Sequence, residues 1–446
     1  MTGVDRSDAG SVESTTDGPG PPALDAITPL GQIEPARSRH MWRRSGVCVH
    51  DGLVVACTWN GEIVAFDVDG GSDECALTER WRRSIAGHPV TVAAVDDALV
   101  VGCRGDRGRI AALDRADGTT NWSYEGVADV GEASSDSVFH WPYVVAVVDD
   151  GDGGCVAAVR RYEHDGQDRR WHSAILRFDA DGAVRWRDET DASVIAIDRD
   201  AAGDHLAVAY NRCGGDHQHG LVVLEAASGS VVWDWDPGTE GERRVGDVTF
   251  DRETGALVAA SHGDYCGYLF DSDGAVDATG SGSERSRVEL ATEHRVGDQT
   301  LYAYPTHAYA HDGRVVFVTG NTYARDAREI AGRHPGEHTA FGYHVDGDTD
   351  APQFRASTGG FVTELAAAGS TVVLPSAQHF RDRDPATHAI RVLDITTGAV
   401  AASPTEGIVT AASTDGQFLA AIEEPIAYHD DEGTLGAYAL HVGRVV

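Results

Sequence analysis

Short apolar runs separated by turn residues recur along the whole chain. Each copy holds two or three apolar residues, an aromatic residue or leucine, and usually an acid. The copies lie at residues 63–67, 110–114, 175–179, 221–225, 267–271, 340–344, 390–394 and 435–439. The last residues of successive copies are 47, 65, 46, 46, 73, 50 and 45 positions apart. A period near 50 residues predicts a repeat architecture such as a propeller rather than unrelated domains.

The second repeat shows how one unit folds. Residues 90–95 form an apolar run, Asp96 and Asp97 make a turn, and residues 99–103 form a second run. A third run at 110–113 follows a glycine-rich loop, and a fourth begins at Trp122. Strands of this length between Asp and Gly turns predict an antiparallel meander. The near-continuous apolar inner strands indicate burial on both faces, as when blades stack.

The turn before the fourth strand repeats its glycine. That glycine stands at Gly118, Gly182, Gly229, Gly274 and Gly398. It permits the positive φ of a tight hairpin turn. A tryptophan follows about four residues later in several copies, at Trp122, Trp186 and Trp233. We expect these large rings to pack between neighbouring blades.

These patterns predict an all-β fold: an eight-bladed β-propeller of four-stranded antiparallel blades, with seven blades as the alternative and a solenoid behind both. Few residues remain after the eighth copy, whereas residues 40–45 resemble residues 79–84 of the first blade. We therefore expect residues 35–45 to supply the outer strand of the last blade and to close the ring by strand exchange. Residues 1–25 are expected to be a disordered acidic leader, and residues 35–446 a single domain.

The fullest copy of the repeat, Ala-x-Asp-x-x-x-Gly-x-x-x-Trp at residues 112–122, resembles the quinoprotein-type (PQQ-like) propeller repeat. The resemblance extends from about residue 40 to residue 446 and implies that the tryptophan docks each blade to its neighbour. Enzymatic members of that family bind pyrroloquinoline quinone (PQQ) beside calcium and use a vicinal disulfide. No two of the seven cysteines here are adjacent. We therefore place a PQQ-dependent oxidoreductase third among the functions considered.

The net charge of the chain limits the classes of partner that it can bind. The chain has 71 acidic and 36 basic residues, a net charge of −35, and every basic residue is arginine. Nucleic acids and anionic membranes require clustered bases, so we expect neither as a partner. The composition resembles that of proteins from salt-in halophiles. With no apolar stretch long enough to span a membrane and no signal-peptide pattern, we expect a cytoplasmic protein.

Cysteine, histidine and acid side chains gather in the predicted loops of blades four and five. The candidates are Cys213, His217, His219, His262, Asp264 and Cys266. This is the ligand set of zinc, and His-x-His spacing can chelate a transition metal. The alternative is that these are ordinary solvated loop residues. A metal-dependent enzyme or sensor built on these loops is the second functional hypothesis.

Two further sets are candidates for binding. The starts of the innermost strands would place Arg44, His88, His140, Asp247, His307 and Glu364 at the mouth of a central channel, although such positions are polar in propellers without ligands too. An insertion in blade six, with helix-forming residues at 324–331, offers Tyr323, Arg325, Arg328, Arg333, His334 and His338 for docking. The leading hypothesis is a non-enzymatic scaffold that binds a protein partner through the loops at 211–220, 262–267, 321–338 and 376–388.

Overall fold

The computed structural model describes residues 22–37, 42–69, 75–166, 168–271, 284–330, 332–347, 350–377, 379, 381–428 and 433–445. Regular structure in these residues is almost entirely β-strand, as predicted. The exceptions are the short helix α1 (Val127–Val130) and one turn of 3₁₀ helix, η1 (Pro385–Thr387). Neither of these described helices is long enough to cross a membrane.

Four of the sheets in the described residues each consist of four consecutive antiparallel strands. The first sheet is β3 (Gly46–His50), β4 (Leu53–Cys57), β5 (Glu62–Asp69) and β6 (Ala76–Ser84). Three others are β15 (Ser193–Arg199), β16 (His205–Arg212), β17 (Leu221–Glu225) and β18 (Val231–Trp235); β19 (Val245–Phe250), β20 (Leu257–Ser261), β21 (Cys266–Phe270) and β22 (Glu284–Glu289); and β28 (Ala366–Ala368), β29 (Thr371–Ser376), β30 (Ala389–Asp394) and β31 (Val400–Pro404).

Two sheets are larger. A five-stranded sheet contains β23 (His294–Val296), β24 (Gln299–His311), β25 (Arg314–Ala324), β26 (Thr339–His344) and β27 (Phe354–Ser357). An eight-stranded sheet contains β7 (His88–Val95), β8 (Ala98–Arg104), β9 (Arg109–Asp114), β10 (Thr120–Glu125), β11 (Tyr143–Asp149), β12 (Cys155–Asp165), β13 (Asp168–Phe178) and β14 (Val184–Thr190). Its two meanders are joined where Arg104 of β8 pairs with Tyr143 of β11.

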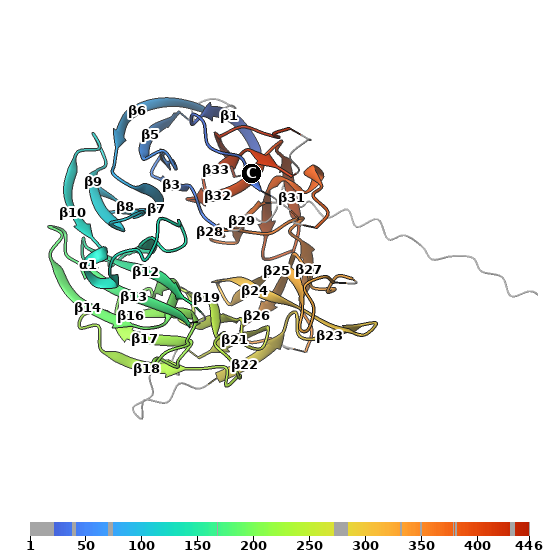
Figure 1. Cartoon of the computed structure of the whole chain (residues 1–446). Coiled ribbons are helices and arrows are strands. Elements are labelled where there is room, and N and C mark those ends of the chain that lie inside the picture. Colours follow the sequence, from blue (N-terminus) through green and yellow to red (C-terminus); the bar gives the residue numbers. More distant parts are fainter. Residues whose placement is uncertain are drawn as a thin grey trace, which may run out of the picture.

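The sheets follow one another in sequence order around a common centre (Figure 1). Neighbouring first strands contact each other: β3 lies against β7, β7 against β11, β15 against β19 and β19 against β24. Apolar side chains between adjacent sheets form the core, in clusters such as the one that joins Leu53 and Ile63 to Leu99 and Val101. This is the arrangement of a propeller, as the repeat predicts.

The last sheet joins both ends of the described chain. It contains β32 (Ile408–Thr414), β33 (Phe418–Glu424), β35 (Ala439–Arg444) and, outermost, β1 (Ala23–Pro29), so blue and red strands lie side by side in Figure 1. The predicted exchange of an N-terminal strand is present, but its assignment to residues 35–45 is wrong. Within that segment β2 (Ala36–Arg37) instead pairs in parallel with β34 (Ile426–Ala427). Residues 38–41 lie outside the described residues.

The expected disordered leader, residues 1–25, overlaps the strand β1. Residues 23–25 belong to this strand, whereas residues 1–21 lie outside the described residues. The strand alternates exposed and half-buried positions, and the half-buried Ala26 and Leu24 pack against the core. This alternation of burial has no counterpart in the residue types, since the exposed positions include Ala23 and Ile27, so the sequence carries no clear period-2 signal for this strand.

Tryptophans on the fourth strand of one meander dock onto the glycine turn of the next meander. Trp122 lies against Gly182 and stacks on Phe178, with ring centroids 5.1 Å apart. Trp186 lies against Gly229 and donates an indole hydrogen bond of 2.8 Å to the carbonyl of Ala226. The predicted packing between blades is present at both rings.

Three related contacts complete this docking pattern. Trp233 packs on Phe270 of the following sheet, although Gly274 lies outside the described residues. Trp81, which was not predicted to dock, lies against Gly118, and Phe354 takes the same place against Gly398. Two independent reasons therefore favour glycine at these turns. The backbone has a positive φ, and a Cβ atom would lie 2.4–2.7 Å from an aromatic ring.

Candidate functional site

A central cavity of about 870 Å³ runs between the inner strands. Three of the six predicted channel residues line it: Asp247, His307 and Glu364. Asp247 accepts a 3.0 Å hydrogen bond from the amide of Ala308 and lies 3.6 Å from the His307 ring. Burial raises the pKa of the Glu364 carboxyl, although Arg43 opposes that change.

The other three predicted channel residues lie elsewhere. Arg44 is 4% exposed and pairs with the fully buried Glu424 of β33, which also accepts hydrogen bonds from Ser45 and Thr410. Arg44 therefore joins the first sheet to the last, and its assignment to the channel mouth is wrong. A long-range buried partner of this kind has no local signal in the sequence.

His88 and His140 are held by their neighbours beside the cavity. The His88 ring stacks between Trp59, at 3.9 Å, and Trp141, at 5.5 Å. His140 accepts or donates hydrogen bonds with Ser134 and Ser135 at 3.0 and 2.8 Å. Neither ring is among the described residues that line the central cavity, and their place at its mouth stays a prediction.

Arginines that the sequence analysis did not select occupy the cavity wall. Arg43, Arg104 and Arg160 all line it, and Arg43 pairs with Glu364 at 2.9 Å. Arg160 donates a 2.9 Å hydrogen bond to the carbonyl of Val194. Their signal was weak because every one of the 36 Lys-or-Arg positions in this chain is arginine, so no single arginine stands out.

The Cys and His loops occupy the predicted positions between second and third strands, but their side chains have other partners. The Cys213 thiol contacts the carbonyl of His219 at 3.5 Å, and burial raises its pKa to about 12. His217 also contacts that carbonyl, at 2.8 Å, while the His219 ring pairs with Asp234. Cysteine binds zinc as a thiolate, and the burial of Cys213 disfavours that charged form.

In the second predicted metal loop, too, the candidate side chains are bonded to other protein groups or buried. Asp264 accepts hydrogen bonds from Tyr268, at 2.6 Å, and from Arg287, at 3.1 Å. Burial raises the pKa of Cys266 too, and burial next to Arg243 lowers the pKa of His262 to about 3. Across the described residues no three His, Cys, Asp or Glu side chains are placed to hold a metal ion. The six predicted ligands therefore do not form a site.

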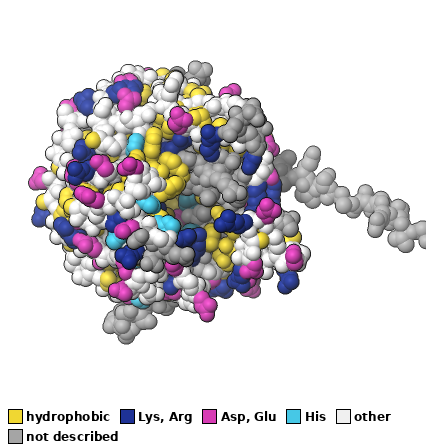
Figure 2. All heavy atoms as spheres, in the orientation of Figure 1, with side chains coloured by type: hydrophobic (Ala, Val, Ile, Leu, Met, Phe, Trp, Pro, Cys, Tyr) yellow, Lys and Arg dark blue, Asp and Glu magenta, His cyan; other side chains and the backbone are white. Residues whose placement is uncertain are grey.

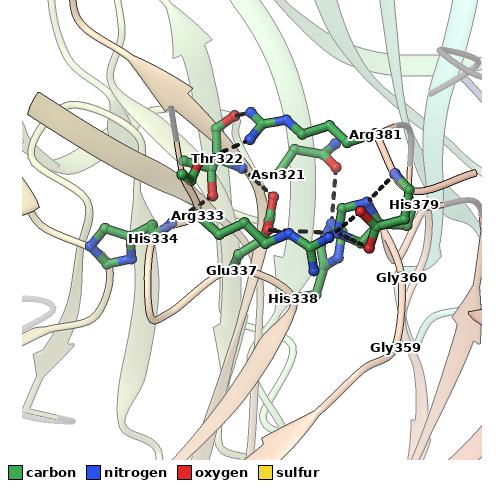
Figure 3. A network of polar contacts seen from close by, with 12 residues as sticks. Asn321, Thr322, Arg333, His334, Glu337, His338, Gly359, Gly360, His379 and Arg381 are labelled. Carbon is green, nitrogen blue, oxygen red and sulfur yellow. Dashed lines mark hydrogen bonds and ion pairs between the residues drawn. The ribbon is translucent and has the colours of Figure 1, made fainter. Parts of the chain in front are cut away.

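A polar network fixes the insertion between β25 and β26 to the loop between β29 and β30 (Figure 3). The Glu337 carboxylate lies 3.6 Å from His379 and accepts a 2.9 Å hydrogen bond from the amide of Thr322. Burial favours the neutral acid, but these hydrogen bonds outweigh it and lower the Glu337 pKa to about 2. His338 donates a 2.9 Å hydrogen bond from Nε2 to the Oδ1 atom of Asn321, and burial lowers the pKa of His338 to about 4.

This network gives two histidines of the insertion a structural role in place of the predicted binding role. His334 and His338 are 7% and 4% exposed, so their predicted role in docking is wrong; they hold the loop in place. Arg333 pairs with Asp382 across the two loops. The expected helix at 324–331 is absent from the described residues 324–330, because β25 continues to Ala324 and residues 325–330 only bend. An isolated helix of that length is marginal.

Half-buried tyrosines lie beside the insertion. Tyr265 stacks on Tyr302 at 4.5 Å, and Tyr304 lies 5.3 Å from Tyr323. The guanidinium of Arg243 sits 4.3 Å above Tyr304. We call these five residues the tyrosine cluster. Arg325 and Arg328 are exposed next to it, and Arg325 pairs with Glu293.

The cavity does not suit PQQ bound with calcium. Calcium requires several carboxylate or carbonyl oxygens around one point. Here Glu364 is paired with Arg43 and Asp247 is bonded to backbone amides, on different sheets. All seven cysteines are buried and unpaired, so the vicinal disulfide is absent as well.

The comparisons with known proteins agree on architecture. A family model described as outer membrane protein assembly factor BamB matches residues 33–124. Quinohemoprotein alcohol dehydrogenase ADHIIG from Pseudomonas putida HK5 is 12% identical, over 96% of this chain and 76% of that chain, with a TM-score of 0.57. The computationally designed Ika8 protein is 14% identical, over 91% and 97%, with a TM-score of 0.53. A europium-containing methanol dehydrogenase is 10% identical, over 94% and 93%, with a TM-score of 0.50.

The comparison with curated proteins finds no match. Identities this low establish a shared fold and no shared activity. The protein thus has a β-propeller fold, and its match to the BamB family model is confined to residues 33–124.

Proposed function

We propose that this protein is a non-enzymatic binding propeller of eight blades, closed by β1, which docks a protein partner on the face formed by the loops between second and third strands. The observation that carries the proposal is the tyrosine cluster. Tyrosine and arginine are the residue types that dominate binding energy at protein interfaces. Here they are half-exposed on one face of a strongly acidic chain.

The rigidity of this face supports the same role. The Glu337 network ties the insertion of one sheet to the loop of the next (Figure 3), so the two loops present one surface. A rigid surface loses little conformational entropy when it binds. In Figure 2 apolar, arginine and histidine side chains gather around the central depression of the face in view.

The remaining support comes from composition and from the family match. The matching model describes an assembly factor, which acts through protein contacts. Seven unpaired buried cysteines fit a reducing compartment, and we keep a cytoplasmic setting as part of the proposal.

The test compares capture of partners from an extract of the source cells. The variant is Tyr302→Ala combined with Arg325→Glu. The matched control is Arg252→Glu, because Arg252 is 54% exposed and pairs with Asp198, while Arg325 is 59% exposed and pairs with Glu293. Arg252 lies in the turn between β19 and β20, at the opposite end of the strands.

We expect wild type and Arg252→Glu to enrich the same protein and the double variant to lose at least about tenfold of it. The captured protein is then purified and its direct binding measured by calorimetry. Equal enrichment by all three chains, or no direct binding, would refute the proposal.

A further inference from the structure

A side pocket of about 290 Å³ opens beside the central cavity, where the β8–β11 junction meets the sheet of β15–β18. Three arginines and two tryptophans are on its wall: Arg104, Arg160, Arg212, Trp141 and Trp171. Asn211 completes the polar part of the wall. The volume is at the lower end of the range for small-molecule sites.

Arg104 is a buried cation that has no hydrogen-bond partner at two of its nitrogens. Its side chain is 6% exposed, and neither Nε nor Nη1 is bonded. The guanidinium lies 4.0 Å from the centre of the Tyr143 ring and 5.4 Å from that of Trp42. Ring contacts stabilise the charge only in part, and unmade hydrogen bonds to a buried charge are costly.

The charges around Arg104 increase that cost. Burial lowers its pKa to about 10, and the neighbouring Arg160 and Arg43 act in the same direction. The nearby carboxylates pair with other arginines: Glu364 with Arg43, and Glu242 with Arg212 at 3.4 Å. Among the described residues, no ion pair joins a carboxylate to Arg104 itself. No acidic side chain lines the pocket among the described residues, although the chain has 71 acids.

The walls also indicate the shape of the missing partner. Trp141 and Trp171 give the pocket flat apolar sides, and Phe139 at its rim is 58% exposed. The Oδ1 atom of Asn211 is buried and has no hydrogen-bond partner. A planar ring would fit between such sides, and a carboxylate would accept from the guanidinium.

We propose that the side pocket binds a small aromatic carboxylate, with its carboxylate on Arg104 and its ring against the tryptophans. This assigns a second site and a different ligand class from the protein-docking face, and it does not depend on that face. An acidic peptide of a protein partner is the competing occupant.

The first experiment titrates the full-length protein with 2-naphthoate by calorimetry. 2-Naphthamide has the same ring without the charge, and cyclohexanecarboxylate has the charge without the flat ring. We expect 2-naphthoate to bind with a Kd at or below about 1 mM and each analogue at least about tenfold more weakly.

Two variants locate the site. Arg104→Gln removes the proposed anchor, and Asn211→Asp places a negative charge in the pocket without changing its size. Arg107→Gln is the control, because Arg107 is 56% exposed and lies outside the pocket. We expect both pocket variants to lose at least about tenfold in affinity and the control to bind as wild type does. Circular dichroism checks that each variant is folded.

Several outcomes would overturn the proposal. They are equal binding of the amide, undiminished binding by folded Arg104→Gln or Asn211→Asp, and no binding of 2-naphthoate at about 10 mM. Tight binding of an Asp- and Glu-rich peptide that is lost in Arg104→Gln, without binding of 2-naphthoate, would replace it with a peptide site.

Discussion

The Glu337 carboxylate shows how one acid can become a structural anchor in a chain that is crowded with acids. Its pKa of about 2 lies below the value near 4.3 of an unfolded glutamate. The folded state therefore binds fewer protons, and the stability that this carboxylate contributes is complete above about pH 4.3. That stability is lost as the pH falls toward 2.

Replacing Glu337 with glutamine should lower the free energy of unfolding at pH 7 by on the order of 2 kcal/mol. At pH 2.5 the difference from wild type should shrink to roughly a quarter of its value at pH 7, because the folded-state carboxylate, with its pKa of about 2, is then protonated in part. Urea unfolding at both pH values and fixed ionic strength measures this. Glu329→Gln, at an exposed position of the same insertion, should change neither value. An equal loss at both pH values would contradict the assigned role.

Single residues were the least predictable level. Asp247, His307 and Glu364 were found because a propeller repeat fixes where inner strands begin. Arg104 and Glu424 were missed because their importance arises from partners distant in sequence and from burial, neither of which a local pattern records. Histidines were overestimated as ligands, since most of them are bonded to backbone carbonyls or stacked on rings.

At the level of elements, the tryptophan–glycine contact is the unit that joins adjacent sheets. Gly229 and Gly52 share a φ of +72°, but only Gly229 faces a neighbour, the Trp186 ring. A Cβ at Gly229 would lie 2.7 Å from that ring, whereas nothing lies within 4 Å at Gly52. Alanine substitutions at the two positions therefore distinguish the cost of backbone strain, which both share, from the cost of a steric clash, which only Gly229 has.

We expect Gly52→Ala to cost about 1 kcal/mol of unfolding free energy through its positive φ alone. Gly229→Ala should cost at least about 1–3 kcal/mol more, because the ring has to move. Denaturant unfolding of both variants measures the difference. In a Trp186→Ala background the excess at Gly229 should disappear, and its persistence would show that the contact is not the cause.

The strand β1 provides the second test at this level. Deleting residues 1–30 should leave the edge of β35 unpaired, lower the unfolding midpoint and promote aggregation. Deleting residues 1–21 keeps β1 and should change neither property. Differential scanning calorimetry and light scattering compare the two. Equal behaviour of the deletions would argue against closure of the ring by β1.

Elements were predictable to the extent that they repeat. The strands of the first blades, the glycine turns and three of the docking tryptophans follow from period and spacing. The segment that pairs with β35 was misplaced because residues 40–45 resemble residues 79–84, whereas Ala23–Pro29 has no alternation of apolar and polar residues that would mark it as a strand. The expected helix failed because β25 extends through its beginning.

For the whole molecule, the net charge of −35 opposes compaction. The unfolding temperature should rise as sodium chloride is raised from about 0.05 to about 1 M, because the Debye length falls from about 14 to about 3 Å. Thermal unfolding followed by circular dichroism measures this. A variant carrying Asp51→Asn, Asp97→Asn and Asp312→Asn, at exposed positions, should respond less steeply. A flat salt response of wild type would contradict the argument.

The pairing of β1 with β35 also determines the order of events when the protein is made. β1 leaves the ribosome first, but its partner is among the last residues synthesised. At roughly 5–20 residues per second, the strand waits some tens of seconds with its backbone unpaired. During that time its half-apolar edge is open to other nascent chains, and the propeller cannot be completed. We therefore expect the yield of folded protein to depend on translation speed and chaperone supply as well as on the stability of the finished fold.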